Sequence, residues 1–158
     1  MPDAGFADAG PGPVMLRAED AEDLRIISAL AQDAVLPVTE ISWQPAQRRL
    51  TLLLNRFRWE DQDAARAEGR PFERVQALMV ISDATRLSSD GIDRADSDLV
   101  LSLLALEWQP GEDGTGRIAL HFAGDGTLVA DVECISVDLR DVTRPYAAPS
   151  GKAPQHPE

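Results

Sequence analysis

One segment near the start of the chain has apolar residues at helical spacing, preceded by acids. The residues on this apolar stripe are Leu24, Ile27, Leu30, Ala31 and Ala34. Four acidic residues within 19–23 come just before the stripe, where they complement the partial positive charge of a helix N-terminus. The pattern predicts one helix with a single apolar face, which Pro37 brings to an end.

Most of the other apolar positions alternate with polar ones or form short continuous runs, as in β-strands. These patterns predict strands at 38–43, 49–54, 72–82, 99–108, 117–122 and 128–134. Asp125-Gly126, between two alternating runs, is the strongest hairpin signal in the chain. The charged stretch 59–71 is either a short exposed helix or a long loop, and 88–98 is a polar loop.

A tripeptide occurs twice, as Trp43-Gln44-Pro45 and as Trp108-Gln109-Pro110, each time at the end of an apolar strand. In both places a loop follows, and then a strand that opens with arginine. This echo suggests a duplicated three-stranded unit. We therefore expect an α+β fold in which the N-terminal helix packs on about six antiparallel strands, arranged as a partly closed barrel.

The two ends of the chain differ in composition from its middle. Residues 1–14 are rich in Gly, Ala, Pro and Asp, and residues 144–158 are rich in Pro. Such segments bury too little apolar surface to offset the entropy cost of ordering them. We expect a single α+β domain at 15–143 between a disordered tail at 1–14 and a disordered Pro-rich tail at 144–158.

Composition and charge narrow the classes of partner. The 158 residues carry a formal net charge of -12. This argues against nucleic acid, whose binding depends on cations that neutralise phosphates. No apolar run approaches the roughly 20 residues of a membrane-spanning helix. There is no secretory pattern and only one cysteine, so we expect a cytoplasmic protein with no membrane partner.

Two groups of residues raise the question of metal binding or catalysis. The aspartates of the loop 88–98 lack calcium-loop spacing, because Gly91 directly follows Asp90. Cys134 is expected to lie buried among apolar residues of its strand, with His121 on the opposite face of the neighbouring strand. We therefore expect no metal, no cofactor and no catalytic residue at these positions.

The most distinctive constellation runs from Asn55 to Glu60, where a strand leaves the sheet. Arg56 and Arg58 have the spacing of one strand face, and Trp59 has that of the other. Two adjacent arginines can clamp a carboxylate or phosphate while an aromatic ring stacks beneath it. The alternative is that the aromatic residues close the core and the arginines pair with Asp93 or other acids. Arg94, beside Asp93, belongs to the same candidate ligand site.

Several segments together resemble a known family. They are EDLRIISALAQDAV, LTLLLNRFRWE, RVQALMVIS, GIDRADSDLVLSLLALEWQPG and LVADVECISVDLRDV. These segments, of which NRFRWE and GIDR are the most distinctive, resemble the bacterial family named domain of unknown function 2948. The resemblance spans residues 16–142 and implies a single cytoplasmic domain. It carries no activity, cofactor or catalytic residue.

The hypothesis that needs the fewest assumptions is a noncatalytic binding or adaptor domain. Its ligand would be an acidic small molecule or a protein partner held at the arginine-rich edge. One alternative is a small hydrolase or isomerase in which Asp93 or Glu60 acts as general base and Arg56 or Arg58 stabilises an anion. The other is a structural subunit that docks into a larger assembly through a sheet edge or an apolar patch.

Overall fold

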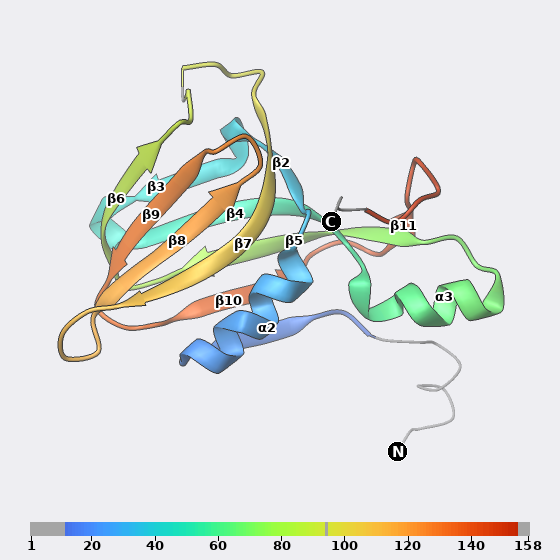
Figure 1. The fold of residues 1–158 in the computed structure, drawn as a ribbon, viewed down its shortest axis with the longest axis horizontal. Helices are drawn as coiled ribbons and strands as arrows, with labels where there is room; N and C mark the ends of the chain where they lie inside the picture. The colour runs from blue at the N-terminus through green and yellow to red at the C-terminus, as the bar shows by residue number, and fades with distance from the viewer. Residues whose placement is uncertain (1–11, 94, 155–158) are drawn as a thin grey trace.

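A computed structural model describes residues 12–93 and 95–154, and within them one antiparallel sheet carries two short helices (Figure 1). The helices are α2 (Ala21–Ala31) and α3 (Gln62–Glu68). Three single 3₁₀ turns are η1 (Val38–Glu40), η2 (Pro45–Gln47) and η3 (Trp59–Asp61). The strands are β1 (Met15–Ala18), β2 (Val35–Pro37), β3 (Ile41–Gln44), β4 (Arg49–Phe57), β5 (Glu73–Ile81), β6 (Ala84–Asp90), β7 (Val100–Pro110), β8 (Gly116–Phe122), β9 (Thr127–Val132), β10 (Val137–Asp141) and β11 (Tyr146–Ala147).

The strands lie in the order β1-β10-β5-β4-β2-β7-β8-β9-β6, with β3 also paired to β4 and β11 to β5. The α+β class is therefore confirmed, but with eleven strands rather than about six. The sheet is not closed, so a barrel is not supported, because closure requires hydrogen bonds between the two edge strands. Within the described residues β1 pairs only with β10, and β6 pairs only with β9.

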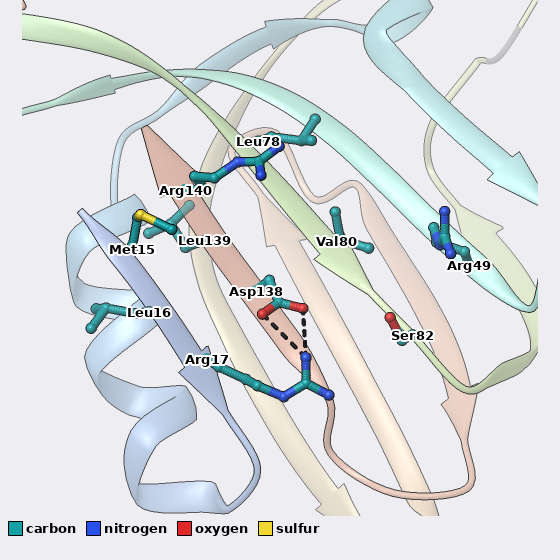
Figure 2. Close-up of a pocket in the computed structure, with 10 residues that line it drawn as sticks. All are labelled: Met15, Leu16, Arg17, Arg49, Leu78, Val80, Ser82, Asp138, Leu139 and Arg140. Atoms are coloured by element: carbon teal, nitrogen blue, oxygen red, sulfur yellow. Dashed lines mark hydrogen bonds and ion pairs between the residues drawn. The ribbon is translucent and has the colours of Figure 1, made fainter. Parts of the chain in front are cut away.

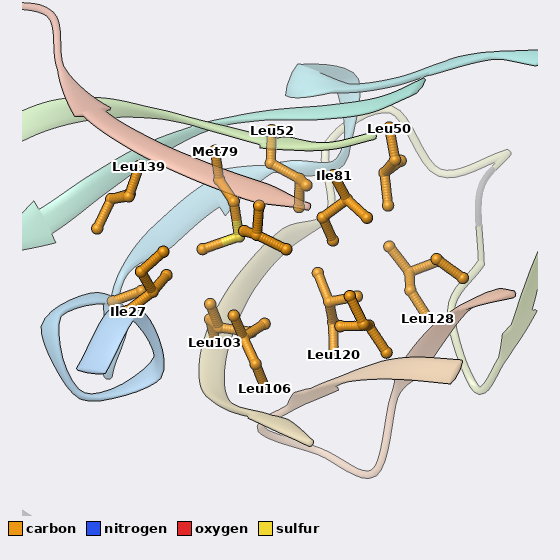
Figure 3. Packing of buried hydrophobic residues seen from close by; sticks show 14 of the residues in the cluster. Ile27, Leu50, Leu52, Met79, Ile81, Leu103, Leu106, Leu120, Leu128 and Leu139 are labelled. Atoms are coloured by element: carbon orange, nitrogen blue, oxygen red, sulfur yellow. The ribbon is translucent and has the colours of Figure 1, made fainter. Parts of the chain in front are cut away.

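The core lies between two parts of the sheet that face each other (Figure 3). Leu52 of β4 and Met79 of β5 come from one part, and Leu103 of β7 and Leu120 of β8 from the other. Helix α2 adds Leu24 and Ile27, both almost fully buried. Each buried side chain of this size contributes about 1.5–3 kcal/mol, so the alternating apolar positions of the strands determine how the sheet folds over.

Helix α2 confirms the helix expected from the sequence, although it is shorter than the apolar stripe suggests. It begins after Asp20, whose side chain accepts a hydrogen bond of 2.8 Å from the backbone N–H of Asp23. It ends at Ala31, well before Pro37, because Asp33 takes a left-handed backbone conformation with φ of 64°. The next residues, including Pro37 itself, form β2 and pair with β7.

The two copies of the Trp-Gln-Pro tripeptide occupy equivalent places in two three-stranded meanders, β3-β4-β5 and β7-β8-β9. Trp43 lies opposite Leu50 in the first meander. Trp108 lies opposite Ile118 in the second, where the hairpin at Asp125-Gly126 is confirmed. The duplication itself stays a prediction.

The remaining expectations concern the connection after β4 and the chain ends. Residues 59–71 include a short helix, α3, which was one of the two alternatives. The predicted tail 1–14 lies outside the described residues except for its last three, of which Val14 hydrogen-bonds to Asp141. In the predicted tail 144–158, Tyr146 and Ala147 form β11, and 155–158 lie outside the described residues.

None of the helices in the described part of the chain has the length and apolar character to cross a membrane.

Candidate functional site

The end of β4 places a fully buried arginine between two carboxylates. Arg56 Nη1 and Nη2 donate to the two carboxylate oxygens of Glu60 at 2.9 and 2.7 Å. Its Nε and Nη2 donate to Asp141 Oδ1 and Oδ2 at 3.0 and 2.9 Å. Arg56 is on β4 and Asp141 on β10, so this bridge crosses the intervening strand β5 on its core-facing side. Both pairs have the bidentate geometry of strong charge-assisted hydrogen bonds.

A second buried arginine extends the same group of charges. Arg58, only 6% exposed, forms ion pairs with Glu73 and, at 3.8 Å, with Asp61. Arg70 in turn donates to both oxygens of Asp61 at 3.1 Å. We call the seven residues the β4 ion-pair cluster. They are Arg56, Arg58, Glu60, Asp61, Arg70, Glu73 and Asp141.

The electrostatics of the β4 ion-pair cluster favour its charged state. Burial alone would lower the pKa of Arg56, but its hydrogen bonds to Glu60 and Asp141 outweigh burial and raise this pKa. Burial alone would raise the pKa of Glu60, but the hydrogen bond from Arg56 and the charge of both arginines lower it. A carboxylate with a lowered pKa is a weaker base, so the geometry does not favour Glu60 as a general base.

The aromatic residues beside these arginines do not form an open stacking platform. Trp59 Nε1 donates to the carbonyl oxygen of Gln32 at 2.9 Å, and its ring packs edge-on against Phe57 with the centroids 4.7 Å apart. The expected separation of arginines and aromatics onto two faces is lost, because β4 ends at Phe57 and the chain turns into η3. Arg56, Phe57 and Arg58 are consequently all buried.

The five residues proposed from the sequence as a ligand site are not brought together. Arg56, Arg58 and Trp59 are neighbours in the segment that connects β4 to α3, and α3 lies on the right of Figure 1. The loop between β6 and β7 lies at the top of the figure. Asp93 belongs to this loop and is exposed, and its Oδ1 accepts from the N–H of Ala95 at 3.0 Å. Arg94 lies outside the described residues. Arg56 pairs instead with Glu60, which the sequence analysis also singled out, and with Asp141, which it did not. Arg58 pairs with Glu73, which no sequence pattern had indicated.

The other reactive residues are also separated. Cys134 is exposed rather than buried, because β9 ends at Val132 and strand alternation does not continue to position 134. Partial desolvation and the nearby carboxylate of Asp83 raise the pKa of its thiol. His121 contacts Glu107 at 2.7 Å. Among the residues that the structure describes, no group of three His, Cys, Asp or Glu side chains has the arrangement of a metal site.

A hollow of about 550 Å³ lies on the opposite side of the sheet from the core (Figure 2). Strand pairing brings outward-facing residues of β1, β10, β5 and β4 side by side there. We call this surface the outer sheet face. Its side chains are Met15, Arg17, Arg49, Leu78, Val80, Ser82, Asp138 and Arg140.

The cations of the outer sheet face differ in whether they are neutralised. Arg17 pairs with Asp138 at 3.1 Å and with Glu19 at 3.4 Å. Arg49 and Arg140 have no hydrogen-bond or ion-pair partner for their guanidinium groups within 12–93 and 95–154. The signal for this face in the sequence was the presence of Leu78 and Val80 at outward positions of a strand whose other face is fully apolar. In a chain with a net charge of -12, two such arginines beside apolar side chains form a surface suited to an anion.

Comparison with known proteins gives a family match, and the family's description names no activity. The family model described as "Protein of unknown function (DUF2948)" matches residues 14–156. No curated protein and no solved structure matches the chain.

Proposed function

The chain belongs to the DUF2948 family, and we propose that it is a noncatalytic binding domain for an anionic small ligand or an acidic protein partner. The observation that supports this proposal is the pair Arg49 and Arg140 beside Leu78 and Val80 in the hollow of the outer sheet face. Guanidinium groups donate several hydrogen bonds in a plane, which suits carboxylates and phosphates. The apolar neighbours add contact area for the rest of the ligand.

The outer sheet face is a better anion site than the arginines at the end of β4. An anion that bound Arg56 would have to displace Glu60 or Asp141, and the side chain of Asp141 is itself only 2% exposed. Leaving one member of a buried ion pair without its partner costs about 3–5 kcal/mol. Arg49 and Arg140 can bind an anion without breaking any such pair.

Capture with matched variants tests the proposal. We would immobilise the full chain as the wild type, as the double variant Arg49→Gln, Arg140→Gln and as the control Arg25→Gln, Arg86→Gln. The control removes two exposed arginines from α2 and β6, so both variants have the same net charge. Each form is incubated with cytoplasmic extract, and the retained metabolites and proteins are identified by mass spectrometry.

The proposal expects at least one anionic metabolite or acidic protein to be retained by the wild type and the control and lost from the outer-face variant. Thermal unfolding of all three forms establishes that each is folded. If both variants retain the same set as the wild type, the outer sheet face is not the binding surface. If both lose the same set, binding reflects net charge alone, and the proposal is wrong.

A further inference from the structure

We propose that the outer sheet face binds a small molecule with two anionic groups joined by an apolar body, one group at Arg49 and the other at Arg140. This inference rests on the proposed function and specifies its ligand class. The separation of the two arginines, the side chains between them and the position of Asp138 support it.

The strand register fixes how far apart the two arginines are. Arg140 on β10 lies opposite Leu78 on β5, and Leu78 lies opposite Leu53 on β4. Arg49 is four residues before Leu53 on β4. With a strand spacing of about 4.8 Å and a rise of about 3.3 Å per residue, the two Cα atoms are separated by about 16 Å. A single small anion is therefore poorly matched to both, whereas two anionic groups on one molecule can each meet one arginine.

Apolar side chains cover the space between the two arginines. Figure 2 shows Leu78 and Val80 between Arg140 on one side and Arg49 on the other. Both apolar side chains are only partly buried, so part of their surface remains open to a ligand. The hollow of about 550 Å³ has the size of a small-molecule site. An apolar body lying across Leu78 and Val80 would gain the hydrophobic contact that a bare dianion lacks.

Asp138 adds a constraint on where the ligand carries its charge. It lies opposite Val80 in the strand register, and its carboxylate is held by Arg17. A negative charge near the middle of the ligand would meet this carboxylate and be repelled, whereas charges at the two ends lie beside arginines. The face therefore selects for the position of charge along the ligand as well as for its sign.

A chain-length series of linear aliphatic α,ω-dicarboxylates tests this arrangement. Each is titrated into the full-length protein by isothermal titration calorimetry, with the monocarboxylate of the same carbon number as the paired control. We expect affinity to reach a maximum at one chain length, where the dicarboxylate binds at least about tenfold more tightly than its monocarboxylate, since a hydrogen-bonded charged group contributes on that scale. Arg49→Gln and Arg140→Gln should each remove this advantage, and Arg86→Gln should leave it unchanged.

The outcomes separate this inference from the proposed function. If no dicarboxylate binds more tightly than its monocarboxylate, or if the advantage survives Arg49→Gln or Arg140→Gln, the dianionic ligand class is wrong. If the capture experiment still shows species that depend on Arg49 and Arg140, the binding function stands with a different ligand, such as an acidic peptide. If capture also shows no such dependence, both proposals are wrong. The unfolding temperature of each variant is measured as well. A loss of the dicarboxylate advantage is assigned to the missing guanidinium group when that temperature equals the wild-type value.

Discussion

The substitution Asp141→Asn tests whether the β4 ion-pair cluster stabilises the fold. Arg56 is fully buried, and Asp141 receives hydrogen bonds from it and from the backbone N–H of Val14. Asparagine keeps the size of the side chain but removes its charge. Removing one partner of a buried pair costs about 3–5 kcal/mol, and Glu60 still compensates Arg56, so we expect a loss near the lower end, about 3 kcal/mol. This corresponds to a decrease in Tm of roughly 6–12 °C for a domain of this size.

Asp138→Asn is a matched control for this experiment, because it makes the same chemical change three residues earlier on β10. Asp138 pairs with Arg17 on the outer sheet face, where both side chains are well exposed to solvent. Exposed pairs contribute about 0–1 kcal/mol. The free energy of unfolding of each variant is measured by urea titration with tryptophan fluorescence. If the two variants lose the same stability to within 1 kcal/mol, the assignment of a structural role to the buried cluster is refuted.

Other substitutions test three separate features. Gly116→Ala should lower the free energy of unfolding in urea by about 1–3 kcal/mol, because the new methyl group would lie 2.4 Å from the Trp108 ring and 2.5 Å from a β7 carbonyl oxygen. The control Gly12→Ala has open space around it and should leave this free energy unchanged. Equal losses in the two variants would contradict this reasoning. Burial would raise the pKa of Glu60, but its arginine partner lowers it; its stabilisation is therefore complete above the ordinary pKa of 4.5 and is lost as pH falls through the folded-state value. The loss of stability below pH 4.5 should be shallower in Glu60→Gln, and an unchanged acid limb would count against the pairing. Desolvation and a neighbouring carboxylate raise the pKa of Cys134, so its alkylation by iodoacetamide at pH 7 should be slower than that of an unstructured cysteine peptide despite its exposure, and a faster rate would contradict the shift.

Local sequence patterns predicted those elements whose stability is determined locally or by one buried face. Helix α2 was predictable from its stripe of apolar residues and from the acidic residues that precede the stripe. The β8-β9 hairpin was predictable from Asp125-Gly126. Strand β6 was missed because it is an edge strand with mostly exposed polar residues, so its sequence has no apolar alternation to detect. β1, β2 and β11 have two to four residues each, too few for any periodicity to stand out.

The candidate site was harder to predict because it depends on contacts between distant parts of the chain. The sequence drew attention to Arg56, but its partner Asp141 is 85 positions away, and nothing local distinguishes that aspartate from the others. Cys134 illustrates a different limit: the alternation of β9 was extended past Val132, where the strand ends. Strand alternation gives the direction of a side chain only up to the last paired residue, and functional side chains often lie just beyond it.

Strand alternation also explains why two arginines of the same strand differ so much in their surroundings. Arg49 and Arg56 are seven positions apart on β4, an odd separation, so they point to opposite faces of the sheet. On the core-facing side, Glu60 and Asp141 neutralise Arg56. On the outer sheet face, the carboxylate of Asp138 is already paired with Arg17, and Arg49 has no ion-pair partner among the described residues. Whether an arginine of this acidic chain is neutralised therefore depends on the carboxylates on its own face of the sheet rather than on the number of arginines nearby in the sequence.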